Sequence, residues 1–181
     1  MKIACLGWGS LLWKTGPLQL ASAWNPDGPT LPIEFARVGD GGELSTALCN
    51  GSWPQTVWWA ELATTSLDEA RELLRQREDI DPARPEWIGS LPGMAQGFEA
   101  EEIGRWLDAM PLDAVVWTAL PPRVDGVEGR CPNAQRAVDY LRGLTGEKLA
   151  HAEHYIRSVP ASLDTVNRRQ ISLSLGWWPK S

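Results

Sequence analysis

The sequence predicts an α+β fold: a small mixed β-barrel surrounded by helices, with a helical C-terminal tail. Three observations predict it. Short apolar runs typical of strands dominate residues 2–119, helical patterns dominate residues 132–175, and the two do not alternate as they would in a doubly wound parallel sheet. A chain of 181 residues is long enough to bury a sizeable core, so we expect one domain over residues 1–181.

The first strands are apolar runs that end at turn residues. Residues 2–7 form the first, and residues 31–38 and 43–49 form a pair joined by the Gly-Asp-Gly-Gly turn at 39–42. Residues 55–63 (QTVWWAELA) are the strongest strand candidate, because aromatic and β-branched residues favour strands.

A helix is predicted over residues 66–78. Ser66 is a suitable N-cap, and Glu69 three residues later completes a capping box. The segment 81–97 is rich in proline and glycine and is predicted to be a loop. It would act as a lid or as a plain linker, with Trp87 either a pocket wall or a residue packed at the surface.

The rest of the chain is mainly helical. We expect one strand at 113–119, a loop at 121–131, and helices at 99–108, 132–143, 145–158 and 162–175. Gly176 and Pro179 end the last helix.

Composition excludes several classes of protein. A net charge of −6 argues against nucleic acid as a partner, and no apolar run approaches the roughly 20 residues of a membrane span. The apolar stretch near the N-terminus is too short for a signal peptide. Cys5, Cys49 and Cys131 are far apart and form no CxxC pair, so we expect reduced thiols in a cytoplasmic protein.

The glycine-rich stretch after the first strand does not match the common catalytic or nucleotide-binding motifs. Gly7 and Gly9 begin a dinucleotide fingerprint, but Leu12 stands where the third glycine is needed. Ser10 lacks the flanking glycines of a nucleophile elbow, since Trp8 and Leu12 occupy those positions.

The two histidines of the chain lie in the helical tail. His151 and His154 are three residues apart with Glu153 between them, a spacing that metal sites use. A solvated helix face is the preferred interpretation, because no third ligand stands nearby in the sequence.

The helix at 66–78 places one carboxylate near its apolar side. At about 100° per residue, its apolar residues cluster on one face: Leu67, Ala70, Leu73 and Leu74. Glu78 lies roughly 70° from the centre of that face, whereas the other acids point to water. Glu78 is then either an inward acid with a pKa raised by burial, or a surface acid paired with Arg75 or Arg77 at a fraying helix end.

These motifs resemble the γ-glutamylcyclotransferase-like superfamily. Residues 7–13 (GWGSLLW) are similar to the GYGSLIW loop of its ChaC branch. Residues 57–60 (VWWA) are similar to the start of its second marked strand, and Arg77-Glu78 to the R-E-G that ends its helix. Residues 154–171 are similar to its C-terminal helix pair, with Asn167 near the end.

The resemblance implies a small mixed barrel and a cofactor-free, metal-free reaction. In that reaction the α-amino group of a γ-glutamyl amide or peptide attacks its own γ-carbonyl and releases an amine and 5-oxoproline. Glu78 would be the acid and base. A small-molecule γ-glutamyl substrate would be bound by the loop residues Gly7, Trp8, Gly9, Ser10 and Leu11.

Two positions depart from the family pattern. Trp8 replaces tyrosine, and Asp79 stands where relatives often have glycine, which leaves the identity of the substrate open. Two other functions therefore stay open. One is a non-catalytic binding module on the same fold, and the other is a related amidotransferase or amidohydrolase that uses the same glutamate.

Overall fold

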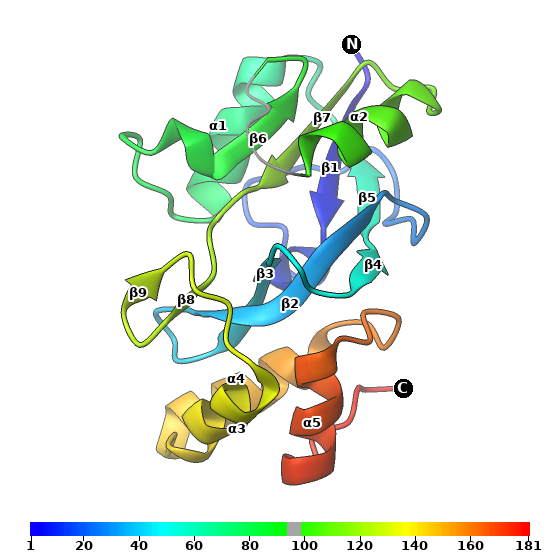
Figure 1. The fold of residues 1–181 in the computed structure, drawn as a ribbon. Helices are drawn as coiled ribbons and strands as arrows, with labels where there is room; N and C mark the ends of the chain where they lie inside the picture. The colour runs from blue at the N-terminus through cyan, green and yellow to red at the C-terminus, as the bar shows by residue number, and fades with distance from the viewer. Residues whose placement is uncertain (94–98) are drawn as a thin grey trace. The chain divides into compact units, whose positions relative to one another are not determined.

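The structure is a computed structural model that describes residues 1–93 and 99–181 (Figure 1). The chain divides into two compact units, each assembled from segments distant in sequence. One comprises residues 1–7, 11–31 and 56–120, and the other comprises residues 8–10, 32–55 and 121–181. Both contain helices and strands, which confirms the predicted α+β class. That the whole chain acts as one domain stays a prediction.

The first unit is built on a four-stranded mixed sheet in the order β5-β1-β7-β6. Its strands are β1 (Ile3–Gly7), β5 (Trp58–Glu61), β6 (Ile88–Leu91) and β7 (Ala114–Thr118). Strand β1 is parallel to β7 and antiparallel to β5, and β6 is antiparallel to β7. Helix α1 (Leu67–Arg77) packs on β6 and β7, and helix α2 (Ala100–Asp108) precedes β7 in the chain (Figure 1).

Helix α1 forms where the capping residues predict it. The Ser66 side chain accepts a hydrogen bond from the backbone N–H of Glu69 at 3.3 Å. The second half of the capping box is different, because the Glu69 carboxylate accepts a hydrogen bond from Thr64 instead. Ala70 and Leu74 are fully buried in the same core as residues of the sheet, so the apolar face of α1 covers the sheet.

The second unit contains the other sheet, in the order β3-β2-β8-β9 with β4 also paired to β2. Its strands are β2 (Thr30–Val38), β3 (Leu44–Leu48), β4 (Pro54–Thr56) and the short hairpin of β8 (Arg123–Val124) and β9 (Val127–Glu128), except that Thr30, Leu31 and Thr56 at the strand ends belong to the first unit. Its helices are α3 (Ala134–Arg142), α4 (Gly146–Ser158) and α5 (Val166–Leu175). Helix α3 packs on α5, and α4 packs on β3. The three helices of the predicted C-terminal tail are therefore confirmed.

The chain also contains two short 3-10 helices, at Ser10–Leu12 and Pro85–Trp87.

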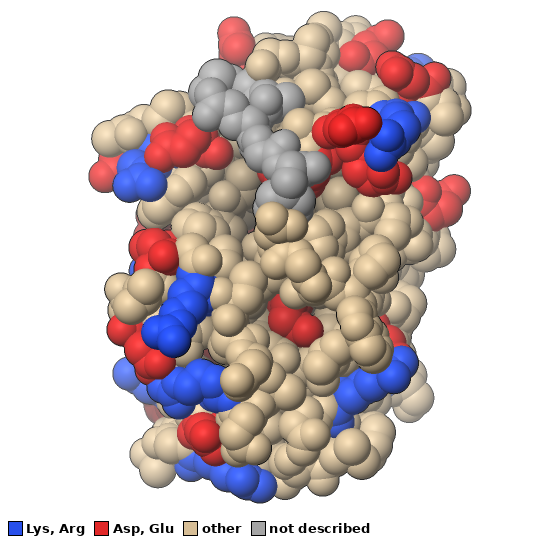
Figure 2. All heavy atoms as spheres, in the orientation of Figure 1, with Lys and Arg blue, Asp and Glu red and all other residues tan. Residues whose placement is uncertain are grey.

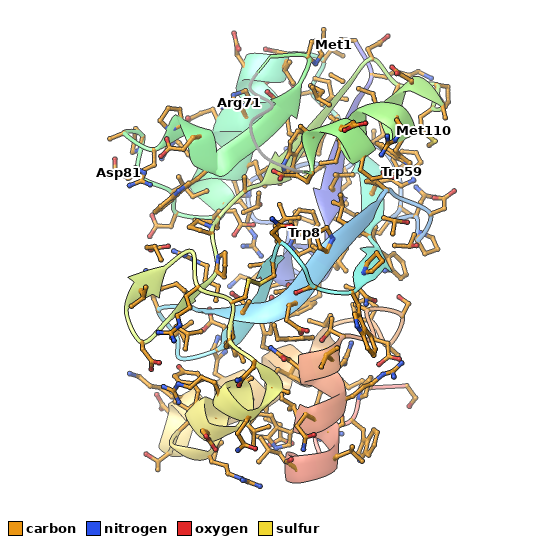
Figure 3. All side chains as sticks on the ribbon, viewed as in Figure 1. Met1, Trp8, Trp59, Arg71, Asp81 and Met110 are labelled. Atoms are coloured by element: carbon orange, nitrogen blue, oxygen red, sulfur yellow. A yellow bond between two sulfur atoms is a disulfide. The ribbon has the colours of Figure 1, made fainter. Side chains whose placement is uncertain are left out.

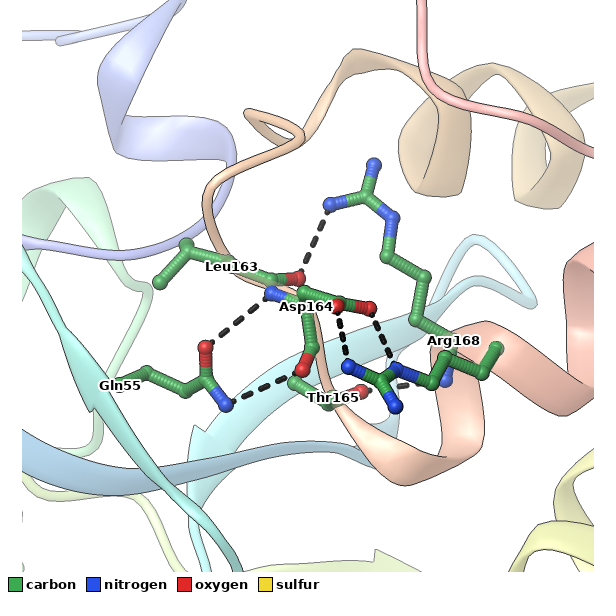
Figure 4. Close-up of polar contacts among 6 residues, drawn as sticks. Gln55, Leu163, Asp164, Thr165 and Arg168 are labelled. Atoms are coloured by element: carbon green, nitrogen blue, oxygen red, sulfur yellow. Dashed lines mark hydrogen bonds and ion pairs between the residues drawn. The ribbon is translucent and has the colours of Figure 1, made fainter.

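The last helix is fixed by two buried polar side chains. The guanidinium of Arg168 donates to four backbone carbonyls: those of Ile156, Val159, Pro160 and Leu163. The side-chain amide of Gln55 extends this network, because it donates to the backbone carbonyl of Asp164 and accepts from the backbone N–H of Asp164 (Figure 4). Asn167, which the resemblance singles out, donates its amide to the carbonyls of Phe35 and Pro132. Asn167 thus joins α5 to strand β2, which is a structural role.

The prediction of three reduced thiols is wrong. Cys49 and Cys131 form a disulfide in the second unit, with their Cα atoms 6.0 Å apart. That separation is within the range that a disulfide spans, although 82 residues lie between them in sequence. Cys5 is free and fully buried in the first unit.

Two predicted loops contain strands. Strand β6 lies within the segment 81–97 and pairs with β7, so this part is a strand of the sheet and not a lid. Residues 94–97 of this segment lie outside the described residues, so for them the lid stays a prediction. Trp87 packs against the core with Arg84 4.2 Å above its ring, in line with the packing interpretation. The loop at 121–131 holds the β8–β9 hairpin, whose turn residues Asp125 and Gly126 both have positive φ.

The strand predicted at 55–63 is divided in two. Val57 separates β4 from β5, and its N–H bonds to the carbonyl of Pro29 at 3.0 Å instead of to a ladder partner. Among the described strands the pairing forms two sheets and no closed barrel, so the barrel stays a prediction. None of the described helices has the length and apolarity needed to cross a membrane.

Candidate functional site

Glu78 is the C-cap residue of helix α1, and its carboxylate is turned toward the sheet of the first unit. Its side chain is 20% exposed. Thr118, the last residue of β7, donates a hydrogen bond from Oγ1 to Glu78 Oε1 at 3.2 Å. The guanidinium of Arg77 lies 3.6 Å from Glu78 Oε2. Glu78 therefore lies toward the core, as the helical spacing predicted. It is also paired with Arg77, as the alternative interpretation predicted.

Burial dominates the electrostatics of Glu78. Desolvation raises the pKa of this carboxyl above its ordinary value, while Arg77 and the hydrogen bond from Thr118 partly lower it. A raised pKa makes the ionised carboxylate a stronger base, and it makes the protonated form available as an acid nearer to neutral pH. These are the properties that proton transfer requires.

Cys5 is a neighbour of Glu78 but is not a candidate nucleophile. Burial, with the Glu78 charge as a second cause, raises the pKa of the Cys5 thiol far above its ordinary value. The thiolate is the reactive form of cysteine, so a thiol held protonated in this way is inert.

The strand order places Glu78 where the glycine-rich loop begins. Strands β1 and β7 are parallel, and Cys5 is registered with Val116. Gly7 and Thr118 each come two residues later, so both lie at the same carboxyl edge of the sheet. Since Thr118 contacts the Glu78 carboxylate, the acid lies at the edge from which residues 7–11 depart.

Arg77 connects the end of helix α1 to the segment that follows the loop. Its Nε donates to the carbonyl of Lys14 at 2.8 Å. Gly16, with a φ of +60°, leaves room for the Arg77 side chain: a Cβ at this position would lie 2.9 Å from Arg77 Cδ. The guanidinium beside Glu78 is therefore held in place from two sides.

The middle of the loop belongs to the second unit. Thr46 donates from Oγ1 to the carbonyl of Trp8 at 2.8 Å, and the hydroxyls of Thr46 and Tyr155 lie 3.0 Å apart. A Cβ at Gly9 would overlap both hydroxyls. Glycine at this position is thus required by close packing of the protein's own side chains.

The structure places the predicted binding residues in both units. Gly7 and Leu11 belong to the first unit with Glu78, and Trp8, Gly9 and Ser10 belong to the second. Trp8, labelled in Figure 3, is 6% exposed, and Leu11 is also buried. Gly7 is the predicted loop residue that the strand register brings to the same sheet edge as Glu78.

Three side chains at these positions were not predicted from the sequence: Thr118, Tyr155 and Trp24. Thr118 ends a predicted strand, but its importance depends on the parallel pairing of β7 with β1, which no local pattern reveals. Tyr155 and Thr46 are 109 residues apart in sequence. Trp24 packs against Gly7 from the segment between the predicted strands at 2–7 and 31–38.

The remaining candidates have ordinary surface roles. His151 pairs with Glu43 at 3.1 Å, and His154 lies 3.2 Å from the ammonium of Lys180. Within residues 1–93 and 99–181, no cluster of three or more metal-binding side chains is present. Asp79 is exposed, which favours a solvated carboxylate at this departure from the family pattern.

Charged side chains of opposite sign are paired at the surface. On helix α2, Arg105 bridges Glu101 and Glu102. Figure 2 shows that acidic and basic side chains lie side by side on this face of the protein. Such exposed pairs contribute little to stability or to binding.

Comparison of the chain with protein-family models, with curated proteins and with solved structures found no match.

Proposed function

We propose that this protein is a γ-glutamylcyclotransferase-like enzyme in which Glu78 is the acid and base. The proposal is supported chiefly by one observation. The carboxylate of Glu78 is largely buried, has a raised pKa, and lies at the sheet edge where the GWGSLLW loop begins. The proposal includes the closure of the strands into the small barrel that the resemblance implies.

The reaction begins with a proton transfer from the substrate's α-ammonium to Glu78. The neutral amine then attacks the γ-carbonyl carbon, and the carbonyl π electrons move to oxygen to form a tetrahedral intermediate. The intermediate collapses when the C–N bond to the departing amine breaks and Glu78 returns the proton to that nitrogen. The ring nitrogen still carries two hydrogens and gives one proton to the released amine. The products are 5-oxoproline and the departing amine as an ammonium ion, and Glu78 is again ionised.

Attack within one molecule decides what the protein must supply. Positioning of an internal nucleophile provides a large part of the rate enhancement, so the protein needs mainly to orient and desolvate the substrate. Glycine-rich loop residues suit the first task, because consecutive backbone N–H groups can bind a carboxylate or a developing oxyanion. We assign this role to Gly7, Trp8, Gly9, Ser10 and Leu11.

A non-catalytic binding module is the second candidate, and Trp8 favours it. The indole lacks the hydroxyl that tyrosine supplies in the family loop, and the Trp8 side chain is buried. In a binding module Glu78 would recognise the ammonium group of a ligand without transferring its proton.

The test is a product assay over glutathione, γ-glutamyl dipeptides and γ-glutamyl amines. Release of 5-oxoproline in equal amount to the free amine is the expected result. Release of free glutamate would instead indicate an amidohydrolase with water as the nucleophile. Ligand binding without any product would support the binding module.

A further inference from the structure

Two indole N–H groups of the first unit are buried without a hydrogen-bond partner among the described residues: those of Trp24 and Trp58. Both side chains are only partly buried, so their rings reach the surface while their N–H groups do not. A buried donor left unpaired costs about 1–3 kcal/mol, and native proteins contain few of them. Two such donors near one strand end therefore need an explanation.

Both tryptophans lie against Gly7. Trp58 on β5 is registered directly opposite Gly7, and residues opposite each other in an antiparallel pair share a face of the sheet. The six-membered ring of Trp24 lies so close to Gly7 that a Cβ there would be 2.9 Å from its Cζ3 atom. The absence of a side chain at Gly7 is what admits the Trp24 ring.

The same face of the sheet carries the Glu78 site. Cys5 precedes Gly7 by two residues, so both point toward the face whose core includes Ala70 and Leu74 of α1. The charge of the Glu78 carboxylate helps to raise the pKa of Cys5. The same carboxylate accepts a hydrogen bond from Thr118, which follows the core residues Ala114 and Val116 on the same face of β7. Trp58, the Trp24 ring, Gly7 and the Glu78 carboxylate therefore lie at one edge of one sheet.

The charges around this edge favour a carboxylate as the ligand of the indoles. Arg77 is engaged by Glu78 and by the carbonyl of Lys14, so the Arg77–Glu78 pair is formally neutral and repels no further anion. Neutral N–H donors bind a carboxylate through charge-assisted hydrogen bonds, which are stronger than those to neutral acceptors. An indole N–H is a donor only, so it cannot serve the ammonium group.

We propose that the indole N–H groups of Trp24 and Trp58 bind the α-carboxylate of the γ-glutamyl substrate and of the 5-oxoproline product. This inference rests on the proposed function. It adds how the enzyme recognises the end of the substrate that carries the α-amino and α-carboxylate groups. Binding of the α-carboxylate beside Glu78 brings the neighbouring α-ammonium to the base, because both groups are attached to the same carbon.

The test measures 5-oxoproline binding to the wild type, Trp24→Phe and Trp58→Phe. Phenylalanine keeps a ring but removes the N–H. Trp59→Phe is the matched control, because Trp59 is adjacent on β5 and its N–H already bonds to Asp27 at 2.8 Å. The first two variants should weaken binding about tenfold or more, and the control by less than about twofold.

A second measurement does not depend on the variants folding. In the wild type, the indole N–H resonances of Trp24 and Trp58 should move downfield on addition of 5-oxoproline. They should not move on addition of 2-pyrrolidinone, which has the same ring without the carboxylate.

The outcomes separate the two proposals. Unmoved indole resonances and unchanged affinity in folded Phe variants would overturn the carboxylate assignment, while 5-oxoproline release would still support the enzyme. If the wild type binds neither 5-oxoproline nor any γ-glutamyl compound and releases no product, both proposals are wrong.

Discussion

Thr118 donates a hydrogen bond from its Oγ1 to Oε1 of Glu78 at 3.2 Å, and this contact joins strand β7 to the C-terminal end of helix α1. It is also what places the carboxylate at the carboxyl edge of the sheet. The hydrogen bond favours the ionised form of Glu78 and so opposes the rise in pKa that burial causes.

Thr118→Val should therefore raise the pKa of Glu78 further. Valine has nearly the shape of threonine, so the fold is kept while the donor is lost. If Glu78 is the base, the acid limb of the kcat/KM profile should move to higher pH, with a loss of about 1 kcal/mol in transition-state stabilisation. Thr118→Ser keeps a hydroxyl and should restore the wild-type profile. An unchanged acid limb in Thr118→Val would show that Thr118 does not affect the pKa of Glu78.

Arg77, like Thr118, should lower the pKa of Glu78. Arg77→Met removes the guanidinium that lowers the pKa of Glu78 and the bond to Lys14. We expect the acid limb to move upward and the free energy of unfolding to fall by about 1–2 kcal/mol. Arg105→Gln, on the exposed face of α2, is the control and should change stability by less than about 0.5 kcal/mol. Equal effects of the two substitutions would contradict the role given to Arg77.

Glu78 should also leave a signature in stability against pH. Its pKa is raised in the folded state, so the folded protein holds this proton to higher pH than the unfolded chain does. The contribution of Glu78 to the free energy of unfolding therefore falls as pH rises above the ordinary value of 4.5. Glu78→Gln removes this contribution, so the variant should gain stability relative to the wild type as pH rises above 4.5. Glu34 and Glu99, whose pKa values burial also raises, are common to both proteins and cancel in the difference. Denaturant unfolding at several pH values measures it, and a difference independent of pH would contradict the buried position of the carboxylate.

Gly9 should tolerate no side chain. Gly9→Ala would place a methyl group against the hydroxyls of Thr46 and Tyr155, and overpacking of this kind costs about 1–3 kcal/mol. Tyr155→Phe removes one of the two hydroxyls, so the double variant should lose less than the sum of the two single losses. A double-mutant cycle of unfolding free energies gives the coupling, and strict additivity would show that the loop relaxes away from Tyr155.

The disulfide between Cys49 and Cys131 should stabilise the second unit. It closes a loop with a sequence separation of 82, so its removal in Cys49→Ser/Cys131→Ser should cost about 2–4 kcal/mol. Thiol counting under denaturing, non-reducing conditions should find one free cysteine, Cys5. Three free thiols would restore the expectation from the sequence.

Local patterns in the sequence predicted the elements well where one segment decides its own structure. Ser66 begins α1, and the spacing of Leu74 and Glu78 predicted which acid could approach the core. The prediction failed where distant segments decide. The strand within 81–97 exists because it pairs with β7, and the disulfide exists because Cys49 and Cys131 meet across a separation of 82.

The same distinction holds for the candidate site. Glu78 and the residues 7–11 were predictable from motifs and helical spacing. Thr118, Trp24 and Trp58 were not predicted as site residues, because their relation to Gly7 and Glu78 depends on strand order and on register. From the sequence, Gly7 and Gly9 were assigned to substrate binding, whereas the structure shows that they also make room for Trp24 and Tyr155.

The most direct test of the central claim compares wild type with Glu78→Gln for 5-oxoproline release from a γ-glutamyl substrate that both proteins bind. The proposal predicts release by the wild type and a loss of about 10²- to 10⁴-fold in kcat for the variant, with binding of the substrate retained. Release that persists at the wild-type rate in a folded Glu78→Gln protein would contradict the assignment of Glu78 as the acid and base.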